Sequence, residues 1–104
     1  MCVPDFILYV MITVLIHFYV RQGMEANFAT LATTNAESRK KADGNLQCQL
    51  FQDDLDEAHF ILLEQFMSQQ AIDAYYASDD YVFWHQSISG MLDRMEGGDY
   101  QQLA

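Results

Sequence analysis

The N-terminal part of the chain carries a run, Phe6 to Val20, that is apolar at odd and even positions alike and holds no formal charge. Val, Ile, Phe, Tyr and Thr dominate this run, and these side chains favour a pleated strand. The run is shorter than the roughly 17 to 25 apolar residues of a membrane-spanning helix, and it stops at the turn signal "RQG". We therefore predict a strand buried on both faces over residues 11–20, with a membrane anchor as the less favoured alternative.

Residues 1–10 differ from residues 11–20, because Pro4 cannot donate a hydrogen bond in the middle of a sheet. We expect residues 1–10 to be an N-terminal extension of a single domain over residues 11–104, with Met11 as a candidate natural start. One long strand over residues 5–20, or a strand with an ordered arm, is the alternative that the pattern leaves open.

One helix and two further strands come next in the chain. Residues 24–41 predict an amphipathic helix, acidic near its start and basic near its end, as the helix dipole favours. Its apolar stripe consists of Met24, Phe28, Leu31 and Ala32. Residues 46–52 alternate apolar and polar side chains, which predicts an edge strand with one wet face. Residues 58–66 are apolar at both parities, which predicts a central strand.

The C-terminal third returns to helical spacing. Ser68 can cap a short helix over residues 68–78. A second helix is predicted over residues 79–95, because its apolar side chains recur every three or four positions. Those side chains are Tyr81, Trp84, Ile88, Met91, Leu92 and Met95. Two glycines follow, and residues 100–103 are a candidate short last strand.

The order of the predicted elements indicates an α+β fold, the ferredoxin-like split βαβ sandwich, with an antiparallel sheet and helices on one face. The first and third strands would be central, and they are the two segments that are apolar at both parities. The helices can cover only one face of the sheet, so the other face must be buried against something else. That other face carries either Ile12, Val14, Ile16 and Phe18 or the alternate positions of the first strand. A second copy of the sheet is the simplest cover, which predicts a homodimer. Whether the last strand is exchanged between the copies is left open.

Composition and charge narrow the function classes. The chain has 104 residues, with 15 Asp and Glu against 5 Lys and Arg, for a formal net charge of −10. This charge opposes binding to nucleic acid and to anionic membrane surfaces. Cys2 and Cys48 lie far apart without a CxxC spacing, so neither a metal site nor a disulfide framework is predicted. A reducing, cytoplasmic location is the expectation.

Four segments together resemble a known family. They are "MITVLIHFYVRQGMEANF", "ESRKKADGNLQCQLFQD" and "FILLEQFMSQQAIDAYYASDDYVFW", followed by "ISGMLD". In their order and spacing, from Met11 to about Met95, the chain resembles the antibiotic biosynthesis monooxygenase family of small dimeric α+β barrels. The family includes quinol monooxygenases, polyketide-oxidising enzymes, haem degraders and an isomerase of a phosphorylated signalling metabolite.

The resemblance implies oxidation of a quinol or related phenolic substrate by dioxygen without any cofactor or metal. Such a reaction needs a dry aromatic cavity, a base and donors for the developing oxyanion. The candidate catalytic residues are His17, which could take a proton if it faces the helices, Trp84, which could form a wall with an N–H donor, and Tyr81. The candidate substrate-binding residues are Tyr76, Glu64, His59 and Asn45.

Each candidate also has a structural interpretation. His17 and Trp84 could be core residues, Glu64 could accept backbone N–H bonds near the helix start at Ser68, and the tyrosines could fill core or rim. His59 and His85 are predicted to be solvated at the surface.

The resemblance has departures, and it leaves other functions open. Many members have a histidine where this chain has Asp80, so a role carried there does not transfer. The alternatives to the enzyme are a non-catalytic dimeric binder or stress-related protein and an isomerase of a signalling metabolite, while haem is disfavoured. A cavity shared by His17 and Trp84 would favour the enzyme, and one filled by Met and Phe would favour the binder.

Overall fold

The computed structural model describes residues 11–104, so the expectations for the extension over residues 1–10 and for a strand starting at residue 5 lie outside the described residues. Residues 11–104 form a four-stranded sheet and three helices, in the order strand, helix, strand, strand, helix, helix, strand. The elements are β1 (Ile12–Val20), α2 (Glu25–Arg39), β2 (Asn45–Gln52), β3 (His59–Phe66), α3 (Gln69–Tyr76), α4 (Asp79–Ile88) and β4 (Leu92–Tyr100). The predicted α+β ferredoxin-like fold is confirmed.

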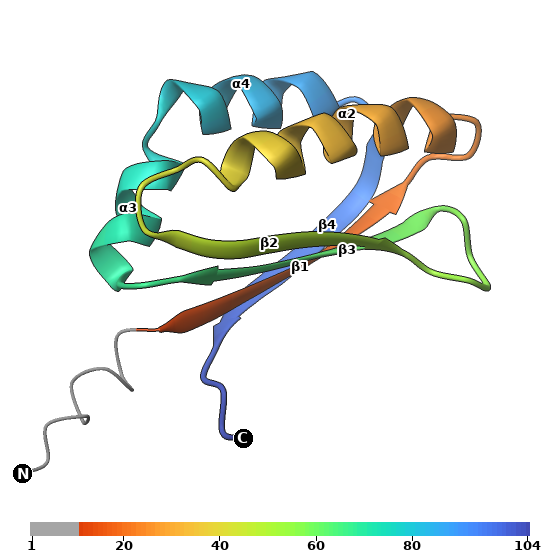
Figure 1. Cartoon of the computed structure of the whole chain (residues 1–104). Coiled ribbons are helices and arrows are strands. Elements are labelled where there is room, and N and C mark those ends of the chain that lie inside the picture. Colours follow the sequence, from red (N-terminus) through yellow and green to blue (C-terminus); the bar gives the residue numbers. More distant parts are fainter. Residues whose placement is uncertain (1–10) are drawn as a thin grey trace, which may run out of the picture.

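The sheet is antiparallel throughout, with the strand order β2-β3-β1-β4. β3 and β1 are therefore central and β2 is an edge strand, as their hydrophobic patterns predict. The helices lie on one face of the sheet, where α2 and α4 touch through the rings of Phe28 and Trp84, and α3 lies near the end of the sheet (Figure 1). None of the helices in residues 11–104 is long and apolar enough to span a membrane.

The two faces of β1 have different surroundings, because successive side chains of a strand point to opposite sides. Val14, Ile16, Phe18 and Val20 are buried beneath the helices. The alternate residues Thr13, Leu15, His17 and Tyr19 are half-buried on the face that carries no helix within the described chain. We call this second face the open face, and it includes the residues of β3 and β4 that pair with these four.

The C-terminal prediction was wrong from residue 89 onward. α4 ends at Ile88, and Met91 to Met95 leave the helix to enter β4, which pairs with β1 over most of its length. The predicted strand over residues 100–103 overlaps β4 only at Tyr100. Without β4 the central strand β1 would expose a row of unpaired backbone groups, so strand pairing overrides the helical spacing of this segment.

The short helices begin where the sequence predicts. The Ser68 hydroxyl accepts a 3.1 Å hydrogen bond from the backbone N–H of Ala71 at the start of α3. The Ser78 hydroxyl accepts one of 3.2 Å from the backbone N–H of Tyr81 at the start of α4. These caps satisfy N–H groups that the first turn of a helix leaves free, and they fix the starts of α3 and α4.

Candidate active site

A half-open pocket of about 390 Å³ lies between the sheet and the two short helices. Its floor comes from β1 and β4, its roof from α3 and α4, and its lining is Val14, Ile16, Ile72, Tyr76, Tyr81, Met95, Gly97, Gly98 and Asp99. The volume falls within the range of about 300 to 1,000 Å³ that small-molecule sites occupy. The pocket is mainly apolar, with two phenol hydroxyls and one carboxylate as its polar side-chain groups.

Gly97 helps to make this hollow. It pairs with Ile16 on the helix side of the sheet, where any larger residue would project into the pocket. A Cβ at this position would lie only 3.3 Å from the backbone oxygen of Leu15. Glycine is therefore the residue that keeps both the close strand contact and the empty volume above it.

Tyr76 and Tyr81 form the polar part of the roof. Their ring centroids lie 4.5 Å apart at an interplanar angle of 73°, an edge-to-face contact that fixes the two rings relative to each other. Burial raises the pKa of Tyr76 to about 12, and the Arg39 guanidinium beside it opposes this rise. The pocket thus offers an aromatic wall that carries two phenol groups.

Behind these tyrosines lies a buried ion pair between Arg39 of α2 and Glu64 of β3. Nη1 of Arg39 lies 2.6 Å from Oε1 of Glu64, and the two side chains are 1% and 0% exposed. Nδ2 of Asn45 donates to the other carboxylate oxygen at 3.1 Å, and Nε of Arg39 donates to Oδ1 of Asn35 at 2.6 Å. Burial raises the pKa of the Glu64 carboxyl, and the guanidinium beside it opposes this rise.

The same guanidinium holds the aromatic roof. Its central carbon lies 4.9 Å from the ring centroid of Tyr75, 5.9 Å from that of Tyr76 and 5.8 Å from that of Tyr81, which are cation–π distances. Within the described part of the chain, Nη2 of Arg39 is buried without a hydrogen-bond partner. The ion pair therefore ties α2 and β3 to the helices that carry the pocket tyrosines.

The structure separates the other two predicted catalytic residues from each other. Trp84 is 6% exposed and packs in the core, with its ring centroid 6.2 Å from that of Phe18 and 5.9 Å from that of Phe28. His17 lies on the open face, on the other side of the sheet. His17 does not face the helices, so it cannot transfer a proton in a cavity on the helix side of the sheet. Any catalytic role of this residue stays a prediction.

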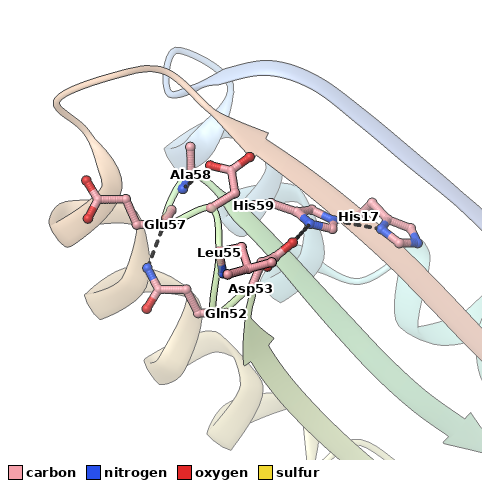
Figure 2. A network of polar contacts seen from close by, with 8 residues as sticks. His17, Gln52, Asp53, Leu55, Glu57, Ala58 and His59 are labelled. Atoms are coloured by element: carbon pink, nitrogen blue, oxygen red, sulfur yellow. Dashed lines mark hydrogen bonds and ion pairs between the residues drawn. The ribbon is translucent and has the colours of Figure 1, made fainter.

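His17 instead belongs to a polar chain on the open face. Its Nδ1 lies 2.9 Å from Nε2 of His59, whose Nδ1 lies 3.0 Å from Oδ2 of Asp53 (Figure 2). The hydrogen bond with His59 lowers the pKa of Asp53. The ring of His59 also stacks on that of Tyr19, with centroids 4.7 Å apart. We call these three residues the Asp53–His59–His17 chain.

The remaining predicted residues are thus distributed over three places. Tyr76 and Tyr81 line the pocket, Glu64 and Asn45 belong to the ion-pair cluster behind it, and His59 joins His17 on the open face. Asp80 is exposed in the first turn of α4 and does not line the pocket.

Sequence reasoning missed three residues of the site. Arg39 belongs to the basic end of the predicted helix over residues 24–41, but the sequence predicts no pairing with Glu64, which lies 25 residues away. Asp99 and Gly97 acquire their place from strand parity in β4, whereas the sequence predicts a helix up to residue 95 and a strand only from residue 100.

Comparison with known proteins agrees with this architecture. The family described as "Antibiotic biosynthesis monooxygenase" matches residues 11–87. The chain is similar to the PA3566 protein of Pseudomonas aeruginosa, with a TM-score of 0.86 and 16% identity over 93% of this chain and 98% of that one. It is also similar to a conserved protein of Methanosarcina mazei, with a TM-score of 0.85 and 20% identity over 95% of this chain and 99% of that one.

A third similar structure has a described activity. SnoaB, a cofactor-independent oxygenase from Streptomyces nogalater, has a TM-score of 0.83 and 14% identity over 91% of this chain and 95% of that one. No curated protein sequence matches the chain. At these identities the structures support the fold, and the family match covers most of the domain. The chain belongs to the antibiotic biosynthesis monooxygenase family.

Proposed function

We propose that this protein is a cofactor-independent monooxygenase that oxidises a quinol or related phenolic compound with dioxygen, in the pocket between the sheet and α3 and α4. The observation that carries the proposal is an apolar pocket of suitable volume that presents two phenol hydroxyls and one carboxylate. Family membership and the similarity to a cofactor-independent oxygenase support it.

The chemistry assigns a role to each polar group of the pocket. The carboxylate of Asp99 accepts the proton of a substrate hydroxyl, and the hydroxyls of Tyr76 and Tyr81 donate hydrogen bonds to the resulting phenolate oxygen. The electron-rich anion then transfers electrons to dioxygen, and a ring carbon forms a bond to one oxygen atom. Cleavage of the O–O bond leaves this oxygen on the ring as a carbonyl, and the second oxygen leaves as water with the two hydrogens lost by the substrate.

Oxygen uptake with a panel of hydroquinones tests this proposal. We expect uptake by the wild type, a loss of about 100-fold or more in kcat for Asp99→Asn, and a smaller loss for Tyr76→Phe and Tyr81→Phe. Trp84→Phe serves as a packing control. His17→Ala tests the remaining catalytic prediction, because a loss as large as that of Asp99→Asn would place the proton acceptor on the open face. No uptake across a broad panel would refute the enzyme proposal.

A non-catalytic small-molecule binder is the second candidate. It is favoured by the packing of Trp84 against Phe18 and Phe28, since His17 and Trp84 share no cavity within the described chain. Equilibrium binding of a hydroquinone without oxygen consumption would support this class. Among the described residues that line the pocket there is no Arg or Lys, which disfavours a phosphorylated ligand and hence the isomerase.

We also propose that the protein is a homodimer that packs through the open face. Leu15, Ile61 and Leu63 give this face an apolar centre. Among the described strand residues of this face the acidic side chain is Glu96, which pairs with Arg94 at 3.3 Å, and beside them Asp53 accepts a hydrogen bond from His59 at 3.0 Å. A chain with a net charge of −10 repels its own copy least where acidic side chains are few and engaged, and the open face meets this requirement. The buried free thiol of Cys48 fits the reducing cytoplasmic location that we propose with it.

A further inference from the structure

The Asp53–His59–His17 chain places two titratable rings in direct contact on a face with an apolar centre. The 2.9 Å contact between Nδ1 of His17 and Nε2 of His59 is a hydrogen bond only when one nitrogen carries a proton and the other does not. The 3.0 Å contact to Asp53 assigns a proton to Nδ1 of His59, because a carboxylate only accepts. In the neutral pair, His59 therefore accepts at Nε2 and His17 donates.

This arrangement tolerates one additional proton but not two. With one imidazolium, the chain keeps both hydrogen bonds, and the new charge is balanced by the carboxylate of Asp53. With two imidazolium rings, both nitrogens of the 2.9 Å contact carry hydrogen, so the bond is lost and two cations face each other. The second protonation must separate the rings or bring water between them.

On the open face of the described strands, no unpaired carboxylate offsets that second charge. Tyr19 lies beside the rings on β1, and Glu96 of β4 is the partner of His17 across the ladder. Glu96 is already engaged by Arg94 at 3.3 Å, and the Arg94 guanidinium lies 4.0 Å from the centroid of the Tyr19 ring. The partner of His17 on β3 is the apolar residue Ile61. An apolar cover over this region would raise the cost of the second imidazolium further.

We propose that the Asp53–His59–His17 chain makes self-association through the open face dependent on protonation, so that two copies pack together near neutral pH and separate when both imidazoles become charged. The inference rests on the proposed homodimer and is independent of the oxygenase activity. The partner is a second copy of this chain, because the open face combines an apolar centre with few acidic side chains in an otherwise strongly acidic protein.

Linkage sets the size of the effect. An ordinary histidine titrates near pH 6.5, and each proton taken up on dissociation can change the dissociation constant by up to about tenfold per pH unit. Each copy contributes one histidine pair, so two protons can be linked to one dissociation event. We expect the dissociation constant to rise by at least about tenfold between about pH 7.5 and pH 5.5.

Sedimentation velocity over a concentration series at both pH values is the test. The variants are His17→Gln and His59→Gln, which keep a polar side chain but cannot titrate in this range. His85→Gln is the matched control, because His85 is an exposed residue on α4, which lies on the opposite face of the sheet. Far-UV circular dichroism of each sample confirms that the monomers compared are folded.

The expected result is a pH-dependent dissociation constant for the wild type and for His85→Gln, and a constant that changes less than about threefold for the two open-face variants. A wild-type dimer of equal strength at both pH values overturns this inference and leaves the homodimer intact. A monomer at both pH values overturns the homodimer and this inference together. Loss of the pH response in His85→Gln alone assigns the effect elsewhere and also overturns it.

Discussion

Replacing Arg39 with methionine is expected to destabilise the fold by about 3–5 kcal/mol, because Glu64 then keeps a buried charge without its partner. The structure supports the upper part of this range. The two side chains are 1% and 0% exposed at a distance of 2.6 Å, so solvent cannot replace the lost guanidinium without opening the core. The same guanidinium also lies against three tyrosine rings, whose contacts are lost with it.

The pH dependence of this variant has a defined sign. Glu64 without Arg39 has a folded-state pKa raised above its unfolded value, so its proton is bound more tightly in the folded state. The destabilisation should therefore be smallest near pH 4.5 and should grow as pH rises towards 8. Urea unfolding at fixed protein concentration, followed by circular dichroism at several pH values, measures the effect.

The double variant Arg39→Met with Glu64→Leu separates loss of the charge partner from loss of packing. Replacing both members with apolar residues removes the uncompensated charge, so we expect this variant to recover most of the stability lost by Arg39→Met alone. A loss below about 1 kcal/mol for Arg39→Met, or an equal loss in the double variant, would refute the reasoning.

Three further predictions concern the thiol, the phenol and the pocket floor. Burial raises the pKa of Cys48 to about 12, so iodoacetamide should alkylate this thiol far more slowly in the folded protein than in the urea-unfolded protein. Mass spectrometry of a Cys2→Ser variant measures the two rates, and equal rates would contradict the prediction. The pKa of Tyr76 is about 12 in the folded state and takes the ordinary value of 10.0 in the unfolded state. The free energy of unfolding should therefore fall as pH rises above 10.0, and it should fall less in the Tyr76→Phe variant. Gly97→Val should fill the pocket and weaken the binding of a hydroquinone, as measured by calorimetry. The control is Gly90→Ala, which should bind normally because an added Cβ at Gly90 meets nothing within 4 Å. Unchanged binding by Gly97→Val would place the ligand elsewhere.

The elements that sequence reasoning predicted well are those whose pattern has a single interpretation. β1 and β3 are apolar at both parities, a pattern that favours a central strand, and both are central. Ser68 is followed by a short amphipathic segment, and it caps α3 as expected. In these cases the local pattern and the tertiary environment make the same demand on the chain.

The boundary between α4 and β4 shows where a local pattern becomes ambiguous. The spacing from Ile88 to Met95 suits a continued helix, yet β4 begins at Leu92 and includes two glycines. A strand with so little side-chain packing is stable here because β1 supplies a complete row of hydrogen-bonding partners. That partner lies about 80 residues earlier in the chain, so no local window contains it.

The amino-acid sequence by itself determined the order of the elements, the central position of the two apolar strands and the family of this protein. Only the tertiary structure decided which face each strand residue occupies, because a period of two assigns residues to two faces without saying which face the helices cover. For this reason His17 joins His59 and Asp53 on the open face, while Tyr76, Tyr81 and Asp99 meet at the pocket. The pairing of Arg39 with Glu64 was likewise decided by packing, since it joins residues 25 positions apart whose charges have no local relation.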